Sequence, residues 1–196
     1  MNPSLHFMAL SAALFAALFA AMGLSPASAQ EWPPKTGTLV VGFAAGGAID
    51  GATRIIAKKL QENTGRTVVV GSRAGAGGNL AHQYVAKAAP DGSVILLGSI
   101  GPLAIAPHLM NVGYDAQRDL TPLAMGVTFP NVLVVNLTVG VKTLAEFVAK
   151  ATAKPGSIDY ASTGNGSASH LAGELLSQRA GIDTVHIPYK GGAAAL

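Results

Sequence analysis

Short apolar runs alternate with amphipathic segments along most of the chain, which is the pattern of an α/β protein. Ile55, Ile56 and Leu60 recur at helical spacing and form the apolar side of a predicted helix, which Gly65 ends. Apolar runs of strand length flank this helix and follow it, at residues 39–43, 67–70 and 94–97. We therefore expect buried parallel strands joined by right-handed crossovers.

The same alternation continues through the second half of the chain. Strands are predicted at residues 122–127, 132–135, 158–161 and 184–187. Thr143 and Glu146 form a capping box at the start of a helix that reaches about residue 153. A later helix should end near Arg179, with Gly181 as its stop. One more strand–glycine–helix unit has only begun at Leu196, so we expect this chain to be the first part of a longer protein.

Two loops of small residues follow predicted strands and precede predicted helices. In the first, residues 44–47 lead into a helix that Asp50 can cap. In the second, residues 162–167 lead into a helix for which Ser167 or Ser169 is the cap. The free N–H groups and the dipole of a helix N-terminus favour an anion. One such loop is equally consistent with a capped turn that binds nothing, but two on separate α/β units favour a small-molecule site between lobes.

The first residues have the features of a secretory signal. Residues 7–24 form an apolar run that Pro26 ends, and the small residues at positions 27–29 provide a cleavage site after Ala29. Residues 1–6 contain neither Lys nor Arg, which leaves a retained membrane anchor as the alternative. The chain contains no cysteine, so it can form neither a disulfide nor a lipid-modified cysteine anchor.

Composition and spacing argue against several classes of function. The net charge of +3 is scattered and aromatic residues are few, so nucleic acid is not an expected partner, whereas a small acidic ligand is. His170 and Glu174 lie one helical turn apart, but zinc normally needs at least three protein ligands. The sequence contains no G-x-S-x-G elbow and no Walker lysine, and the glycines near residue 164 lack the third glycine of a dinucleotide fingerprint. We predict no catalytic residues, no metal and no cofactor.

A series of motifs together resembles one family. The motifs are residues 43–50 with Gly46-Gly47, residues 73–78, Pro90-Asp91-Gly92, Tyr114-Asp115, residues 119–122, Lys154-Pro155-Gly156, residues 162–174 and residues 188–191. Each motif is weak alone, but they follow the order of the family across nearly all of the chain after residue 29. The sequence is similar to the periplasmic solute-binding receptors of tripartite tricarboxylate transporters, the Bug family.

The resemblance implies a two-lobed α/β fold of the periplasmic-binding-protein type, incomplete in this chain. Residues 30–122 would form the first part of lobe 1, and residues 123–196 about half of lobe 2. In the family a ligand carboxylate lies between two loops and is bound largely through water and backbone groups. Carried over, the ligand-binding residues are Phe43, Gly46, Gly47, Asp50, Ser162, Gly164, Asn165, Gly166, Ser167 and His170. The implied protein is a periplasmic monomer that passes a small carboxylate to membrane transporter or sensor subunits.

Some residues depart from the family pattern or have a second interpretation. Ala44 and Ala45 stand where the family usually has prolines, which puts ligand affinity in question more than the fold. Asp50 would repel a carboxylate, so it would act through its cap or by accepting an amino group or a water. Two other functions stay open at this stage: an exported α/β enzyme that acts on a small acid, and an inactive truncated gene product.

Overall fold

A computed structural model describes residues 34–196. The predicted signal sequence and its cleavage site after Ala29 lie outside the described residues. Within residues 34–196, no helix has the length and apolar character needed to cross a membrane.

Three parallel strands form the first sheet, in the order β2-β1-β3. They are β1 (Thr36–Val41), β2 (Thr67–Ser72) and β3 (Val94–Leu97). The central strand β1 pairs with both neighbours, and its residues Leu39, Val40 and Val41 are almost completely buried. The parallel sheet and the three strands expected in this half of the chain are therefore confirmed, within a few residues at each end.

Helix α2 (Ala48–Thr64) connects β1 to β2 and is the first crossover. Gly65 ends it in the left-handed conformation with a φ of 66°, as predicted. The prediction of its apolar side was partly wrong, because Ile55 is 72% exposed while Thr53 and Ala57 are buried. Small residues face the sheet, which allows the helix to lie close to the strands, and Ile55 projects away from them.

The chain between the sheets contains little regular structure. After the short 3-10 turn η1 (Ala76–Gly78) and α3 (Asn79–Ala86), it forms the π-helical turn η2 (Gly101–Ile105), α4 (Ala106–Leu109) and, later, the 3-10 turn η3 (Leu137–Val139).

The strands predicted at residues 122–127 and 132–135 are wrong, since the structure forms no strand at residues 121–136. Leu123 and Val132 are about three-quarters exposed. Apolar, β-branched residues form strands only where a neighbouring strand is available for pairing.

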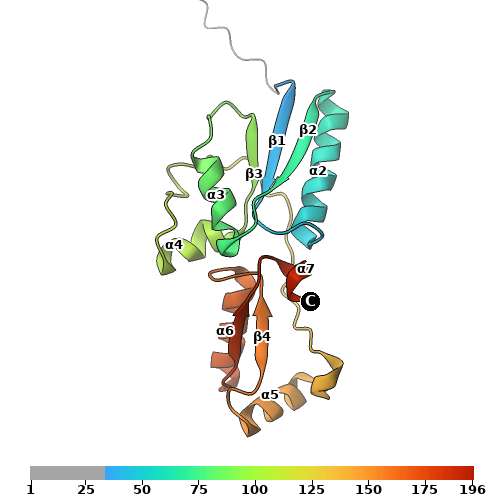
Figure 1. Ribbon diagram of the computed structural model, residues 1–196, viewed down its shortest axis with the longest axis vertical. Coiled ribbons are helices and arrows are strands. Elements are labelled where there is room, and N and C mark those ends of the chain that lie inside the picture. The colour runs from blue at the N-terminus through green and yellow to red at the C-terminus, as the bar shows by residue number, and fades with distance from the viewer. Residues whose placement is uncertain (1–33) are drawn as a thin grey trace, which may run out of the picture. The chain divides into compact units, whose positions relative to one another are not determined.

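Two parallel strands form the second sheet, β4 (Asp159–Ser162) and β5 (Val185–Pro188), which confirms the last two predicted strands. Helix α6 (Ala168–Ala180) lies beside β4, as Figure 1 shows. Helix α5 (Leu144–Ala153) contributes Phe147 and Ala151 to a small core with Ile182. The short helix α7 (Gly192–Ala195) follows β5.

The predicted capping box at Thr143 is present in a modified form. The Thr143 hydroxyl accepts the backbone N–H of Glu146 at 3.2 Å. The Glu146 carboxylate accepts the N–H of Lys142 at 2.6 Å, one residue before the usual partner. The start of α5 is thus fixed from both sides, as the sequence indicated.

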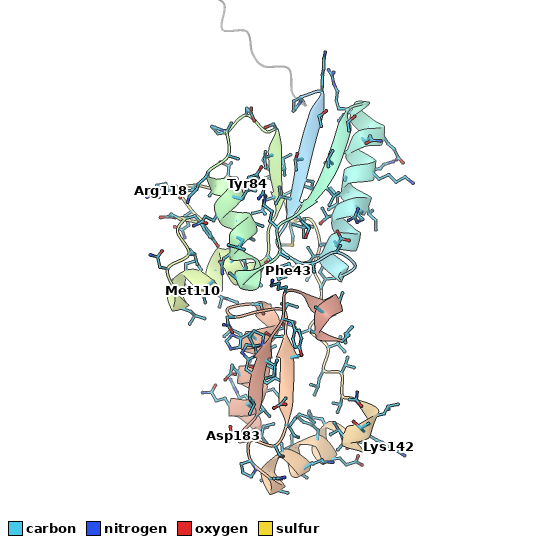
Figure 2. The ribbon with its side chains drawn as sticks, in the orientation of Figure 1. Phe43, Tyr84, Met110, Arg118, Lys142 and Asp183 are labelled. Atoms are coloured by element: carbon cyan, nitrogen blue, oxygen red, sulfur yellow. The ribbon has the colours of Figure 1, made fainter. Side chains whose placement is uncertain are left out.

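The loops that contain the predicted ligand-binding residues follow the carboxyl ends of parallel strands, at one edge of each sheet. Residues 42–47 follow β1, residues 73–78 follow β2, and residues 163–167 follow β4. Phe43 lies at the carboxyl end of the first sheet, where β1 ends (Figure 2). Ligands of open α/β sheets bind beyond the carboxyl ends of the strands, so the predicted loops occupy the expected position.

Candidate ligand-binding site

The first loop is held in shape by Asp50. Gly46 has a left-handed backbone with a φ of 86°, and its N–H donates to Asp50 Oδ2 at 3.0 Å. The N-cap position itself belongs to Gly47, which corrects the expectation that Asp50 would cap the helix from that position. Asp50 lies inside the first turn instead, and its carboxylate reaches back to the loop. An acidic residue in the first turn also complements the helix dipole.

The Asp50 carboxylate is buried and ionised at neutral pH. The guanidinium of Arg54 donates from Nε to Oδ2 at 3.0 Å. This bond and the N–H of Gly46 hold the pKa of Asp50 below its usual range. The other oxygen, Oδ1, is buried without a hydrogen-bond partner among the described residues. Because Oδ2 accepts hydrogen bonds from both the Gly46 N–H and Arg54, Asp50 stabilises the conformation of the first loop.

The second loop, residues 162–167, is a network of short-range hydrogen bonds. The N–H of Gly164 donates to Ser162 Oγ at 3.1 Å, and the N–H of Gly166 donates to His170 Nδ1 at 3.2 Å. Ser167 is the N-cap of α6, and its hydroxyl accepts the N–H of His170 at 3.3 Å. Of the two predicted caps, Ser167 is therefore the one used. Ser169 instead accepts the N–H of Thr163 at 2.9 Å.

His186 belongs to this network, although the sequence analysis did not select it. Its Nε2 atom lies 2.6 Å from Ser162 Oγ, and its ring stacks on that of His170 with the centroids 4.0 Å apart. The ring of Tyr160, the residue opposite His186 in the parallel pairing, lies 4.9 Å away on centroids. The signal that could have revealed His186 is this register, because residues opposite each other on paired strands share a face.

A carboxylate and a phenol complete the surroundings of the two imidazoles. The Tyr160 hydroxyl donates to Glu174 Oε1 at 2.6 Å, and the same oxygen lies 3.9 Å from His170 Nε2. Burial and the bond to Glu174 raise the pKa of Tyr160 well above its usual range. Burial and the neighbouring His170 lower the pKa of His186, and Glu174 opposes this shift. The neutral imidazole of His186 is thus favoured.

The Ser162 hydroxyl and the His186 imidazole are arranged like a nucleophile and its base, but a substrate cannot reach the hydroxyl. Ser162 is 1% exposed, and its oxygen already accepts the N–H of Gly164. A hydroxyl enclosed in this way is a structural bridge, since a nucleophile must reach its substrate. Within residues 34–196, no three or more His, Cys, Asp or Glu side chains are close enough together to hold a metal ion.

Glycines let the loops of the two sheets touch. Gly77, with a φ of 64°, lies against the backbone of Gly164 and Asn165, and a Cβ atom on Gly164 would lie 2.8 Å from the Cα of Gly77. Ala44 donates its N–H to the carbonyl oxygen of Lys190 at 3.0 Å. The first and second predicted loops therefore belong to one region of contacts. The ligand role of each residue in it stays a prediction.

Phe43 and Asn165 are two of the larger side chains of this region. Phe43 is half-buried, and its ring packs near Gly78, where a Cβ atom would lie 3.2 Å from it. Asn165 is exposed, whereas Gly164, Gly166 and Ser167 on either side of it are buried. Backbone and small side chains thus form most of the region, and the Phe43 ring and the Asn165 amide are among the groups available to a ligand.

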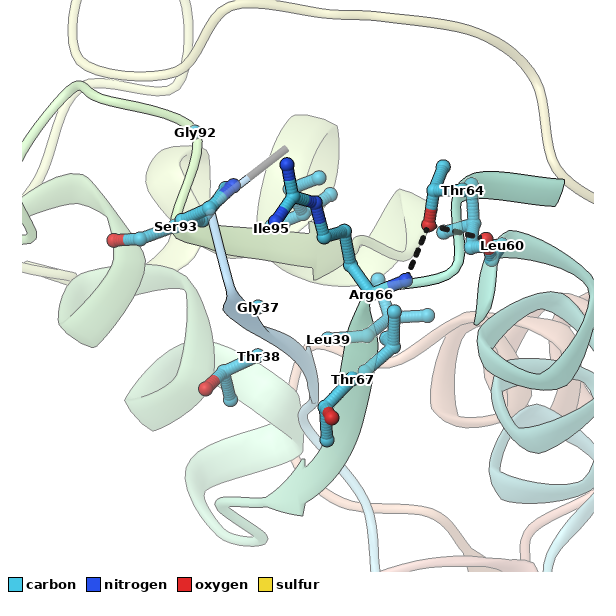
Figure 3. Close-up of a pocket in the computed structure, with 12 residues that line it drawn as sticks. Gly37, Thr38, Leu39, Leu60, Thr64, Arg66, Thr67, Gly92, Ser93 and Ile95 are labelled. Atoms are coloured by element: carbon cyan, nitrogen blue, oxygen red, sulfur yellow. Dashed lines mark hydrogen bonds between the residues drawn. The ribbon is translucent and has the colours of Figure 1, made fainter. Parts of the chain in front are cut away.

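A surface pocket lies at the opposite end of the three-stranded sheet (Figure 3). Its walls include Gly37, Thr38, Thr67 and Ser93, at or beside the amino ends of the strands. The Thr64 hydroxyl closes one side by accepting the N–H of Arg66 and donating to the carbonyl of Leu60. Because this pocket faces away from the loops at the carboxyl ends, we do not assign the ligand site to it.

Comparison with known sequences gives a consistent result. A family model described as the tripartite tricarboxylate transporter family receptor matches residues 52–196. A curated protein from Pseudomonas sp. strain P51, described as the UPF0065 protein in the tcbD–tcbE intergenic region, is 37% identical over 186 residues. That match covers 93% of this chain and 55% of the relative. The chain therefore spans about half the length of the curated relatives it matches.

Solved structures show the same partial coverage. Rpa4515 of R. palustris, described as the complex with adipate, has a TM-score of 0.79, 35% sequence identity, and coverage of 83% of this chain and 55% of that one. MatC of Rhodopseudomonas palustris, described as having bound malate, has a TM-score of 0.76 and 32% identity, with coverage of 82% and 55%. The periplasmic binding protein BugD has a TM-score of 0.65 and 32% identity, with coverage of 83% and 54%. The described residues thus form part of a periplasmic-binding-protein fold.

Proposed function

Because the chain belongs to the tripartite tricarboxylate transporter receptor family, we propose that it is a receptor that captures a small organic carboxylate outside the cytoplasm for a membrane transporter. The observation that carries this proposal is the pair of glycine-rich loops at the N-termini of α2 and α6, which are connected through two other loops: Gly77 lies against Gly164 of the second loop, and Gly191 lies against Ala44 of the first. Structural neighbours described with adipate and malate support a carboxylate as the ligand class.

The loops favour an anion through backbone dipoles rather than through cations. The first N–H groups of an α-helix have no partner within the helix and can donate to a bound carboxylate. At α2 these groups follow Gly47, and at α6 they follow Ser167. In the proposed site, Asp50 keeps the first loop in its left-handed turn, and it is separated from the ligand because its bonded oxygen is directed at Gly46 and Arg54.

Side chains would set which carboxylate is bound. Phe43 offers an apolar surface to a carbon chain, while Asn165 and His170 offer polar groups. Ser162 and Ser167 are buried and would act by holding the backbone N–H groups of the second loop. This division of roles fits a site in which backbone and water make most contacts and a few side chains discriminate between ligands.

Location and partners extend the same proposal. The predicted signal at residues 1–29 and the family assignment support a periplasmic protein that passes its ligand to transporter or sensor subunits. That the protein acts as a monomer stays a prediction. An enzymatic role has less support, because the one Ser–His pair at the site is enclosed.

Calorimetry of the chain with adipate and with malate tests the proposal. We expect saturable binding that is unchanged by a chelator and no turnover of the bound acid. The test variant is Gly166→Ala and its control is Gly140→Ala: both glycines are left-handed, with φ of 72° and 71°, but only Gly166 lies in the second loop. Both variants should lose about 1–2 kcal/mol of stability from the left-handed backbone, with a further loss at Gly166, where the new Cβ would lie 3.2 Å from the Cβ of Ala106, and only Gly166→Ala should weaken binding. Binding of neither acid, or loss of binding with the chelator, would contradict the proposal.

A further inference from the structure

The second loop rests on two stacked imidazoles, and each imidazole is hydrogen-bonded to a different part of it. His186, from β5, bonds to the Ser162 hydroxyl at the start of the loop, and His170, from α6, bonds to the N–H of Gly166 near its end. The ring planes are 19° apart and the ring centroids are separated by 4.0 Å. The shape of the loop is therefore tied to the protonation state of these rings.

At Ser162 the hydrogen bonds are complete only when His186 is neutral. The Ser162 oxygen accepts the N–H of Gly164 at 3.1 Å, and its own proton can go to His186 Nε2 at 2.6 Å. If Nε2 carries a proton, it must donate to Ser162, whose hydroxyl proton is then left with the Gly164 carbonyl at 3.4 Å. That distance is long for an O–H donor, so protonation leaves the Ser162 hydroxyl with a poor acceptor and disfavours the present arrangement of Ser162 and Gly164.

The hydrogen bond at Gly166 depends directly on the protonation state of His170. The N–H of Gly166 donates to His170 Nδ1 at 3.2 Å, which requires a lone pair on that nitrogen. A neutral His170 carries its proton on Nε2, on the side of Glu174. A second proton has only Nδ1 to occupy, and it would replace the acceptor with a donor that faces the Gly166 N–H. Protonation of His170 therefore removes this bond.

Two titratable residues lie beside the rings. Tyr160 from β4 stacks on His186, and its hydroxyl donates to the carboxylate of Glu174 from α6 at 2.6 Å. Glu174 Oε1 is 3.9 Å from His170 Nε2, too far for a direct hydrogen bond. Burial and the adjacent His170 lower the pKa of His186, against the opposing effect of Glu174. Two imidazolium rings at this separation would also repel each other.

We propose that His186 is a positioning residue for residues 162–167 and that, together with His170, it makes carboxylate binding weaken as the pH falls. The part of this proposal that concerns the ligand rests on the proposed function. The part that concerns the loop stands on the hydrogen bonds alone. Because protonation of the imidazoles disrupts the loop, a lower pH reduces the population of the loop in its present shape. Carboxylate affinity then falls with that population, since the ligand binds the present shape.

The first experiment examines the loop without ligand. The backbone N–H signals of Gly164 and Gly166 and the ring signals of the histidines are followed by NMR from pH 8 to pH 5 in the full chain. We expect the Gly164 signal to shift with the midpoint of the His186 ring, whose pKa is lowered from the usual value of 6.5, and the Gly166 signal to shift with protonation of the His170 ring. His186→Gln retains a side-chain acceptor that does not titrate, and in it the transition at Gly164 should disappear. The control His108→Gln, at an exposed position of α4, should leave both transitions unchanged.

The outcome that overturns the positioning role is clear in the same spectra. Backbone signals that stay constant from pH 8 to pH 5, or that titrate equally in His186→Gln, would contradict it. Should His186→Gln fail to fold, His170→Asn serves instead: its amide oxygen can accept the Gly166 N–H, and the Gly166 transition should be lost. His82 is buried, which lowers its pKa, and it is present in all variants, so only differences between variants count.

The second experiment measures adipate affinity at pH 7.5 and pH 5.0. We expect roughly tenfold weaker binding at the lower pH in the wild-type chain, since one pKa unit of coupling corresponds to a factor of ten. The ratio of the two affinities should be smaller in His186→Gln than in the wild-type chain, and the part that remains reflects His170 and the protonation of adipate itself. Equal affinity of the wild-type chain at both pH values would overturn the proposed pH dependence. Absence of adipate binding at both pH values would contradict the proposed function instead, while the backbone titration would still decide the positioning role.

Discussion

The aromatic ring of Tyr160 lies directly against the backbone of Gly173, so that α6 approaches β4 at a residue without a side chain. A Cβ atom at Gly173 would lie 2.7 Å from Cζ of the ring and closer still to Cε2. The same ring stacks with His186 and donates its hydroxyl to Glu174. Gly173 thus allows the Tyr160 ring to reach the histidine cluster beneath the second loop.

The variant Gly173→Ala should destabilise the protein, because the added methyl group overlaps the Tyr160 ring. We expect a loss of about 1–3 kcal/mol in the free energy of unfolding, measured by denaturant titration. The matched control is Gly51→Ala in α2, where no atom lies within 4 Å of the added Cβ. That variant should gain up to about 1 kcal/mol from helix propensity. A gain in both variants would show that α6 does not approach β4 this closely.

Asp50 should make stability depend on pH in the acid range. Its pKa is lowered in the folded protein by Arg54 and by the N–H of Gly46, so the unfolded chain binds more protons as the pH decreases. The stabilisation is fully present above the unfolded value of 3.8 and is lost as the pH falls through the lower, folded value. Asp50→Asn should lose about 1–3 kcal/mol at pH 7 and show a shallower loss of stability below pH 4.

Denaturant titrations between pH 7 and pH 2.5 check this prediction. The control is Asp183→Asn, at an exposed aspartate in the loop before β5. It should leave the free energy of unfolding at pH 7 within about 0.5 kcal/mol of the wild-type value. Equal stability of Asp50→Asn and wild type at every pH would mean that the Asp50 carboxylate does not hold the first loop.

Variants of two N-cap residues distinguish an effect on stability from an effect on ligand binding. Ser167 caps α6 and Thr143 caps α5, with oxygen-to-nitrogen distances of 3.3 and 3.2 Å. Replacement of either by alanine should cost about 1 kcal/mol of unfolding free energy. Only Ser167→Ala should also weaken adipate binding in calorimetry, because Ser167 lies in the second loop. Equal effects of the two variants on binding would argue against a ligand at the start of α6.

Local patterns predicted most of the regular structure correctly. Each strand of the first sheet has an apolar run, and the stops at Gly65 and Gly181 are residues with left-handed backbones, which glycine adopts at low cost. The failure at residues 122–135 has a different cause. Strand propensity there is high, but a strand also needs a partner along its edge, and the described residues supply none at that place.

The sequence allowed the two loops of the site to be predicted, but not the hydrogen-bond network that holds them. Glycines and hydroxyls between a strand and a helix indicated both loops, and Ser167 was one of two predicted caps. The prediction that Asp50 occupies the N-cap was wrong, because a carboxylate can reach Gly46 from the first helical turn as well as from the N-cap. His186 was missed because its role depends on the pairing of β5 with β4 and on the packing of α6, which join residues far apart in the sequence.

The most direct test of a carboxylate site at these loops is a map of the backbone N–H groups that respond to a ligand. In the ¹⁵N-labelled chain at pH 7.5, addition of adipate or malate should shift the signals of Gly46, Gly47, Gly164 and Gly166 saturably, with a common dissociation constant. The signals of Thr67 and Ser93, at the pocket of Figure 3, should stay in place. Shifts confined to that pocket, or no saturable shift in either loop, would contradict the assignment of the carboxylate site.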